Sequence, residues 1–293
     1  MQFKNKKTSS RITLNAVLLF ISVLWIIPIL FIFSLSFTPE DSIKAYGYRL
    51  IPKSFTVKSY DYIFKNPTQL LDSYKVSTFV TVVGTSVSLL FTTCVAYAMA
   101  RKDFILSKYI SRYMLFALLF RGGLIPTYIV VTQWLHLGNT ILALILPLLV
   151  SPWSVFMMRS FLSQTPYEIL EASFIDGASE WRTFFQIVLP ISKSSLATIG
   201  LLTMFGYWND WQQGLLYIDN VKLYPLQLLL YKIISNIQFI LQNAFNVVVE
   251  TGSFPSIATR MATCVISIAP MFLAFSFFQK YLVKGIIIGS VKG

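Results

Sequence analysis

Six long apolar runs constrain this chain more than any other feature of its sequence. A helix that crosses a hydrocarbon layer of about 30 Å needs roughly 20 apolar residues. The runs cover about residues 14–37, 76–100, 110–131, 141–161, 195–216 and 261–281. Charged residues make up only 12% of the 293 residues, against roughly 25% in a soluble domain. The sequence therefore predicts an all-α, polytopic membrane protein with about six transmembrane helices, organised as one transmembrane domain over residues 1–293.

The basic residues predict the orientation of these helices. Many of the Lys and Arg residues lie in short segments at helix ends, namely the N-terminal tail, residues 101–112, residues 159–193 and the C-terminal tail. The others lie mainly in two long connections, which translocate largely regardless of charge. We therefore expect a multi-pass protein of the cell membrane with both termini in the cytoplasm. The orientation of the helices in the membrane and contact with membrane lipid then account for the net charge of +12, and we expect no nucleic-acid partner.

The sequence lacks the residues that several classes of function require. No G-x-x-x-x-G-K-[ST] pattern is present to hold nucleotide phosphates, and His136 is the only histidine, so a His-pair metal site is excluded. Asp210 is the only carboxylate within the six runs, whereas ion-coupled carriers usually need intramembrane carboxylates or broken helices around the ion. We expect no enzyme activity, no metal and no cofactor in this chain. A stand-alone or ion-coupled carrier remains an alternative.

One polar segment, PYEILEASFIDGASEWRTFFQIVLP at residues 166–190, interrupts the apolar second half of the chain. The spacing of Tyr167, Leu170 and Phe174 predicts an amphipathic helix with one apolar stripe. Thr165 is placed as its N-cap, with Glu168 three residues later completing a capping box, and Gly177 ends it. A second stripe is predicted from four apolar residues further on: Trp181, Phe184, Phe185 and Val188.

Such a helix either lies among lipid headgroups or docks into a groove of a partner. Helices at an anionic membrane surface favour a basic polar face. The first turns of this helix instead carry Glu168, Glu171 and Asp176, with no Lys or Arg. The pattern therefore favours docking to a partner protein.

The same segment resembles a known motif. The order Glu171-Ala172-Ser173, Gly177, Ile187 and Leu189-Pro190 is similar to the EAA motif of the inner-membrane permease subunits of bacterial ABC importers. With Pro166, Glu168, Asp176 and Phe184 it resembles the maltose-type, sugar-importing branch. The resemblance implies that the segment at residues 163–193 contacts the ATPase through the following residues: Glu168, Glu171, Ala172, Ser173, Asp176, Gly177, Ile187, Leu189 and Pro190. Ser173 stands where the motif commonly has Ala, a change between small residues that should not abolish docking.

The resemblance also implies a type I ABC importer permease fold and a set of partners. These partners are a second homologous permease subunit, two cytoplasmic ABC ATPase subunits that bind ATP and Mg, an extracellular solute-binding protein and an oligosaccharide substrate. ATP-driven closure of the ATPase pair would carry the segment along and switch the bundle between inward-open and outward-open states. An ABC permease for a solute other than a sugar remains the milder alternative.

Two further stretches, GGLIPTY at residues 122–128 and GYWNDW at residues 206–211, resemble the permeases for complex oligosaccharides. Aromatic and amide side chains suit the faces and hydroxyls of sugars, so the candidate substrate path comprises Arg121, Tyr128, Tyr207, Trp208, Asn209, Asp210 and Trp211. An interfacial aromatic belt, a kink at the glycines and a structural salt bridge of Arg121 are the alternatives. The outer loop at about residues 219–259 resembles the one that reaches into the binding protein.

Overall fold

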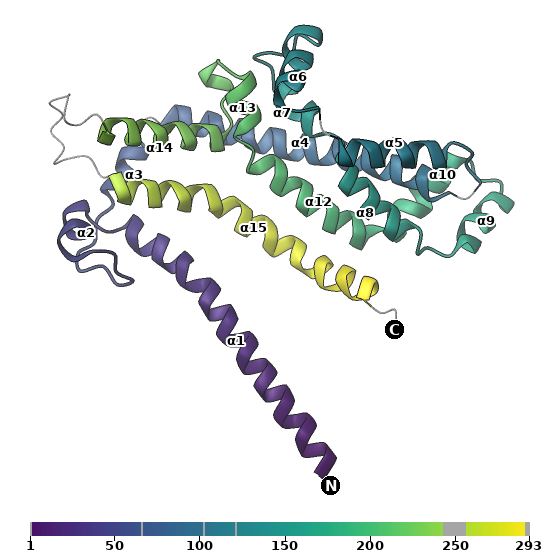
Figure 1. The fold of residues 1–293 in the computed structure, drawn as a ribbon, viewed down its shortest axis with the longest axis horizontal. Helices are drawn as coiled ribbons and strands as arrows, with labels where there is room; N and C mark the ends of the chain where they lie inside the picture. Colours follow the sequence, from purple (N-terminus) through teal and green to yellow (C-terminus); the bar gives the residue numbers. More distant parts are fainter. Residues whose placement is uncertain (1, 66, 102, 121, 243–255, 291–293) are drawn as a thin grey trace. The chain divides into compact units, whose positions relative to one another are not determined.

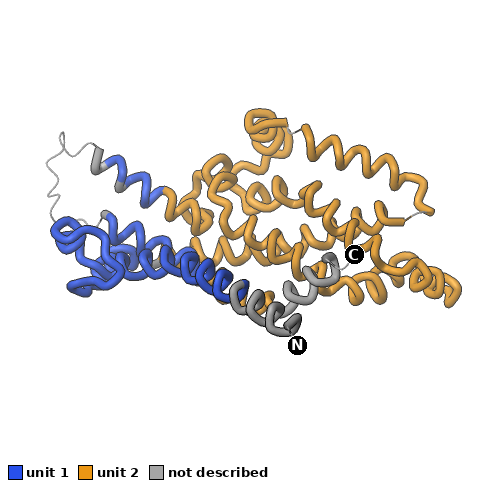
Figure 2. Tube along the Cα trace, turned by 60° about the horizontal axis from the view of Figure 1, so that its bottom comes forward, with its two compact units in different colours: residues 1–67, 232–269 blue, residues 68–231, 270–293 orange. Residues whose placement is uncertain are grey.

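The computed structural model describes residues 2–65, 67–101, 103–120, 122–242 and 256–290, and every regular element in these ranges is a helix (Figure 1). Two compact units are distinguished, one of residues 1–67 and 232–269 and the other of residues 68–231 and 270–293 (Figure 2). Two of the sequence-based predictions lie wholly or partly outside the described residues: Arg121, and residues 243–255 of the outer loop.

The first unit contains α1 (Gln2–Ser36), α2 (Glu40–Tyr46), α3 (Lys58–Ile63), the later part of α14 (Leu226–Gln242) and the first part of α15 (Ser256–Ser290). Leu35, Ile43 and Ala258 form its small buried cluster. A carboxylate oxygen of Glu40 accepts a hydrogen bond of 3.1 Å from the backbone N–H of Ile257. This contact satisfies one of the free donors at the start of α15.

The second unit contains the remaining helices. They are α4 (Pro67–Ala100, of which Thr68 onward belongs here), α5 (Ser107–Leu119), α6 (Leu124–Ile129), α7 (Ile141–Ile145), α8 (Pro152–Leu162), α9 (Tyr167–Ile175), α10 (Glu180–Thr183), α11 (Leu189–Ile191), α12 (Lys193–Trp208) and α13 (Gln212–Tyr217), with the first residues of α14 and the end of α15. Val130–Trp134 and Phe184–Val188 are π-helical turns. Helix α8 packs against α5 and α12.

The six apolar runs fall on two kinds of helix. Leu14–Ser36, Thr68–Ala100 and Ile257–Gln279 are continuous helices long and apolar enough to cross a membrane. The runs at 110–131 and 141–161 fall on helix pairs, Ser107–Leu119 with Leu124–Trp134 and Ile141–Leu148 with Pro152–Leu162, the second of them bent by 53°. The run at 195–216 is shifted, because the third pair joins Glu180–Ile191 to Lys193–Trp208 with a bend of 82° and so begins and ends earlier than that run. If each pair is one span, the described chain has up to six.

Local sequence explains where these pairs break. Gly123 has φ +88° at the start of α6, a conformation that residues with a Cβ rarely adopt. Pro152 begins α8, where its missing N–H costs no hydrogen bond. Hydropathy alone shows an unbroken run at these places, since it registers composition and not backbone conformation.

Two buried clusters hold the second unit together. One includes Val80, Leu144, Tyr207 and Leu228. The other joins Ala96 and Met99 of α4 to helices α8 and α12 and to the π-helical turn Phe184–Val188. The second cluster positions the polar segment discussed below.

The contact between α4 and α12 depends on a glycine. A Cβ on Gly84 would lie 2.7 Å from the ring of Tyr207, closer than real Cβ contacts come. The Tyr207 ring cannot simply move, because it is buried and its hydroxyl donates a 3.0 Å hydrogen bond to the carbonyl of Ile145. Gly84 therefore lets α4 approach the ring closely.

We expect Gly84→Ala to destabilise the protein by about 1–3 kcal/mol, as overpacking of a filled core does. The matched control is Gly206→Ala on α12, where an added Cβ meets nothing within 4 Å. Thermal melting of the detergent-solubilised protein measures both. Equal melting temperatures for the two variants would contradict the prediction.

Candidate functional site

Helix α9 has an inner and an outer face. Leu170 and Phe174 are half-buried and Ser173 is buried, which confirms the inward stripe expected from the sequence. The outer face carries three acids, an alanine and an isoleucine, all of them exposed: Glu168, Glu171, Ala172, Ile175 and Asp176. Ile175 has 86% of its surface exposed. The helix thus presents acidic groups around a large apolar side chain that this chain does not cover.

The expected capping box at the start of α9 is wrong. Pro166, in an extended conformation, is the N-cap, and no side chain caps the helix. The helix starts one residue later than the sequence suggested, so Thr165 lies outside it, and a proline side chain has no oxygen to accept a hydrogen bond. The first N–H groups of α9 receive no side-chain cap from the N-cap residue.

The predicted stop at Gly177 is confirmed. Gly177 has φ +77°, its N–H donates to the carbonyl of Phe174, and the N–H of Ala178 donates to the carbonyl of Ser173, both at 3.0 Å. This is the Schellman arrangement, in which a left-handed residue reverses the chain and satisfies the last carbonyls. An added Cβ at Gly177 would meet nothing within 4 Å, so glycine is favoured here by its backbone alone.

A buried hydrogen bond joins α9 to α10. The hydroxyls of Ser173 and Thr183 lie 2.6 Å apart, and both residues are buried. The serine that departs from the usual motif is therefore part of the internal packing of the segment and not of its outer face. Sequence reasoning did not pair these two residues, because nothing in the spacing showed that the chain folds back at Gly177.

The apolar stripe expected from Trp181 to Val188 divides into two. Phe184 and Val188 are buried, whereas Trp181 and Phe185 are exposed and stacked with their ring centroids 6.0 Å apart. These four residues therefore do not form one buried face, which corrects the expectation. The wider π-helical turn that begins at Phe184 shifts the register on which the stripe was drawn.

Of the three remaining motif residues, Ile187 lies within this turn, and Leu189 and Pro190 follow it. Ile187 and Leu189 are half-buried, and Pro190 is exposed at the second position of α11. Leu189 packs against the cluster that contains Phe184 and Val188. The end of the motif thus anchors the segment in the second unit.

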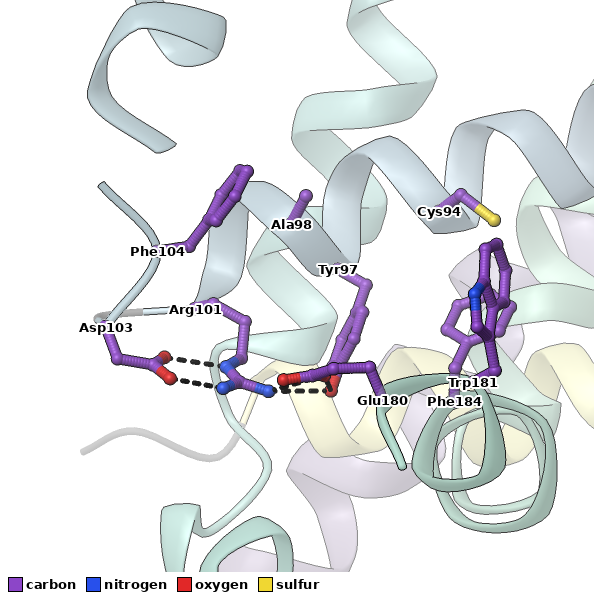
Figure 3. Close-up of a pocket in the computed structure, with 9 residues that line it drawn as sticks. All are labelled: Cys94, Tyr97, Ala98, Arg101, Asp103, Phe104, Glu180, Trp181 and Phe184. Atoms are coloured by element: carbon purple, nitrogen blue, oxygen red, sulfur yellow. Dashed lines mark hydrogen bonds and ion pairs between the residues drawn. The ribbon is translucent and has the colours of Figure 1, made fainter. Parts of the chain in front are cut away.

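Arg101 was expected only to signal topology. In the structure it lies at the centre of a hydrogen-bonded network with Tyr97, Asp103 and Glu180 (Figure 3). Its Nη1 donates to a carboxylate oxygen of Glu180 at 2.9 Å and to the hydroxyl of Tyr97 at 3.0 Å. A second edge of the guanidinium pairs with Asp103, and its centre lies 4.8 Å from the ring of Phe174. The hydrogen bond from Arg101 lowers the pKa of Asp103, and the same bond raises the pKa of Arg101.

A cavity of about 470 Å³ lies beside this network (Figure 3). Arg101 and Glu180 line its polar end, and Cys94, Trp181 and Phe184 line its apolar end. A second cavity, of about 540 Å³, lies between the start of α9 and the ends of α4 and α8, with Arg159 and Glu168 in its wall. Within the described ranges, no three His, Cys, Asp or Glu residues are grouped as metal ligands are.

The aromatic residues of the predicted substrate path occupy different environments. Tyr207 and Trp208 are buried, 5% and 4% exposed, which favours a packing role for both. Trp211 is exposed and stacks on Tyr231, with ring centroids 4.5 Å apart. Tyr128, also exposed, stacks on Tyr217 at 5.9 Å. Tyr231 was missed, because it lies in a different helix from the motif.

Asp210 was expected inside a helix, but α12 ends at Trp208 and Asp210 lies in the break before α13. One of its carboxylate oxygens accepts the N–H groups of Gln212 and Gln213, at 3.2 and 3.3 Å. It therefore satisfies free donors at the start of α13. Asn209, next to it, is exposed.

The Ser173–Thr183 contact predicts a non-additive pair of substitutions. Ser173→Ala leaves a buried hydroxyl on Thr183 without its partner, which should cost about 1–3 kcal/mol of stability. Adding Thr183→Val, which removes that hydroxyl at nearly constant shape, should restore part of the loss. Thermal melting of the single and double variants forms the test, and simple addition of the two losses would argue against a shared hydrogen bond.

Comparison with known proteins identifies the family. Residues 8–288 match the model of a family described as "Binding-protein-dependent transport system inner membrane component". The chain is 37% identical over 273 residues to Protein LplC of Bacillus subtilis, covering 93% of this chain and 91% of that protein. It is 33% identical over 276 residues to the polygalacturonan/rhamnogalacturonan transport system permease protein YtcP of the same organism, covering 94% and 96%.

A solved structure agrees with these relatives. The crystal structure of a bacterial ABC transporter involved in the import of the acidic polysaccharide alginate contains a chain that matches with a TM-score of 0.78 and 25% identity, over 93% of this chain and 97% of that one. The present protein is accordingly a permease, a transport subunit rather than an enzyme, that works with an ATPase and a solute-binding protein. The chain belongs to the family of inner membrane components of binding-protein-dependent transport systems.

Proposed function

We propose that this permease carries an oligosaccharide across the cell membrane by alternating access, and that the segment at residues 163–193 is the seat of its ATPase. The observation that carries the second part is the outer face of α9, where Ile175 stands exposed among Glu168, Glu171 and Asp176. An apolar side chain ringed by acids suits an apolar pocket with a basic rim.

The inner side of the segment also supports a role in coupling to the ATPase. The Ser173–Thr183 hydrogen bond and the Schellman turn at Gly177 hold α9 and α10 together, and the buried Phe184 and Val188 hold the segment against α4, α8 and α12. A segment held in this way moves as a body when its partner moves. ATP binding then shifts the population of the permease because the closed ATPase pair favours one position of the seated helix.

We place the segment and both termini in the cytoplasm, since the short basic segments at the helix ends favour that side. We also propose that the chain pairs with a second homologous permease and that the assembly contains two ATPase subunits, one for each coupling segment. ATP and Mg bind to those subunits and not to this chain. The outer loop that begins near Asp219 then faces the extracellular binding protein.

The oligosaccharide cargo is supported by the relatives and by one surface of the second unit. The names of the similar proteins concern polygalacturonan, rhamnogalacturonan and alginate. Trp211 and Tyr231 form an exposed stacked pair, and the amides of Asn209 and Gln212 lie exposed nearby in the sequence. Aromatic faces and amides bind the apolar faces and hydroxyls of sugar rings, so this pair is our candidate contact on the path.

The docking proposal predicts that Ile175→Ser weakens co-purification of the ATPase with the permease about tenfold, because it removes a large apolar contact. Glu171→Lys should act in the same direction by reversing the charge of the face. Pull-down of the ATPase from solubilised membranes measures both.

The matched control is Ile51→Ser, which truncates an isoleucine that is 83% exposed in the connection after α1, on the side that we place outside the cell. It should leave co-purification unchanged. Normal assembly of the Ile175→Ser and Glu171→Lys variants would count against the docking proposal.

The cargo proposal predicts ATP-dependent uptake of an oligosaccharide by proteoliposomes that contain the whole assembly and its binding protein. An acidic galacturonan oligosaccharide and a neutral maltooligosaccharide serve as the two probes. Trp211→Ala should slow uptake about tenfold, since an aromatic contact contributes about 0.5–1.5 kcal/mol beyond its buried area. Trp211→Phe should keep most of the rate.

Trp134→Ala, which truncates another exposed tryptophan, is the control and should transport normally. An inactive ATPase should abolish uptake. Transport of neither probe, or transport driven by an ion gradient without ATP, would contradict the cargo or the energy source that we propose.

A further inference from the structure

Arg101 is attached rigidly to the end of a membrane-spanning helix. It directly follows Ala100, the last residue of α4, and its backbone N–H still donates to the carbonyl of Tyr97 at 3.2 Å. Its backbone therefore continues the hydrogen-bonding pattern of α4. A residue that contacts the Arg101 guanidinium is therefore linked to α4.

The guanidinium holds both helices of the proposed coupling segment. In α10, the first residue, Glu180, accepts hydrogen bonds from Arg101 at 2.9 Å and from the Tyr97 hydroxyl at 3.2 Å, and Arg101 also donates to that hydroxyl at 3.0 Å. These three groups form a closed triangle (Figure 3). In α9, the ring of Phe174 lies 4.8 Å from the guanidinium centre, within the range of a cation–π contact.

The burial of the partners is unequal. The Arg101 side chain is only 9% exposed, whereas that of Glu180 is 60% exposed. An isolated ion pair with so exposed an acid contributes little to stability. An enclosed guanidinium is different, because its donors lose water and need their partners in fixed directions. The network therefore fixes the orientation of the α9–α10 segment on α4 more than it adds to the stability of the protein.

Apolar packing alone does not fix the orientation of the segment on α4, so this depends on Arg101. The segment and α4 also share an apolar cluster, which contains Phe184 and Leu170 of the segment and Met99 and Ala96 of α4. Apolar contact is not directional, so it resists separation better than it resists sliding. At the edge beside Arg101 the packing is incomplete, since Cys94 of α4 and Trp181 of α10 both line the cavity of about 470 Å³.

We propose that Arg101 is the positioning residue that locks the α9–α10 segment to α4, so that movement of the segment is passed to the membrane-spanning helix. This proposal rests on the coupling role proposed above for the segment. Arg101 itself lies behind the outer face of α9 and is not assigned to ATPase docking. Its loss should therefore leave the ATPase bound and disconnect hydrolysis from transport.

The test uses the complete assembly in proteoliposomes, with the oligosaccharide of the two named probes that the unmodified assembly imports. Arg101→Met keeps an unbranched side chain without the charge, and we expect normal ATPase co-purification with at least ~5-fold less oligosaccharide moved per ATP hydrolysed. Arg101→Lys keeps the charge without the planar fork, so its ratio of oligosaccharide moved to ATP hydrolysed should lie between those of the unmodified assembly and Arg101→Met. Arg112→Met removes an exposed arginine of α5 and should leave the ratio unchanged.

Two further measurements separate positioning from general weakening. Glu180→Gln should lower the ratio in the same way, and adding it to Arg101→Met should cause no further loss, because both act through one contact. With Cys264→Ser as background, maleimide labelling of Cys94 should become several-fold faster in Arg101→Met, since the network no longer holds α10 beside the cavity that Cys94 lines. The labelling needs no cargo.

A normal transport-to-hydrolysis ratio in Arg101→Met, or a multiplied loss in the double variant, would overturn the inference. If Arg101→Met does not assemble, Glu180→Gln alone decides, because it changes only an exposed acid, and a normal ratio there also overturns the inference. Failure of the underlying coupling proposal looks different, since Ile175→Ser would then bind the ATPase normally.

Discussion

Every backbone N–H and C=O within a hydrocarbon layer must find its partner inside the protein, and the rest of this structure depends on that constraint. It explains why every regular element in the described ranges is a helix. It also limits where a helix can break. The breaks in the bent pairs fall at residues such as Gly123 and Pro152, where the backbone tolerates them.

The polar segment is held together by contacts that differ from those expected. A cap at each end was expected, but only the turn at Gly177 caps α9, and Pro166 leaves the start without a side-chain cap. The other contacts are tertiary, namely the buried Ser173–Thr183 hydrogen bond and the packing of Phe184. The acidic and apolar groups of the outer face remain exposed.

The aromatic segment at the end of α12 illustrates how one sequence motif supplies several environments. Tyr207 turns inward against Gly84, and Asp210 accepts hydrogen bonds at the start of α13. Trp211 remains exposed and stacks on Tyr231, a residue of another helix. Only the exposed members of the motif are available to a sugar, so the candidate path is narrower than the motif.

The helical membrane class, the apolar runs, the inward stripe of α9 and the stop at Gly177 could all be predicted from the sequence. These follow from hydropathy, from the helical period and from the freedom of glycine at positive φ, all of which are local. Three features emerge only from the packed helices: Ser173 meets Thr183, Trp181 is exposed while Phe184 is buried, and Arg101 joins α4 to Phe174 and Glu180. Residues about 80 positions apart in the chain meet only once the helices pack, and the side on which a helix packs depends on neighbours that no local pattern encodes.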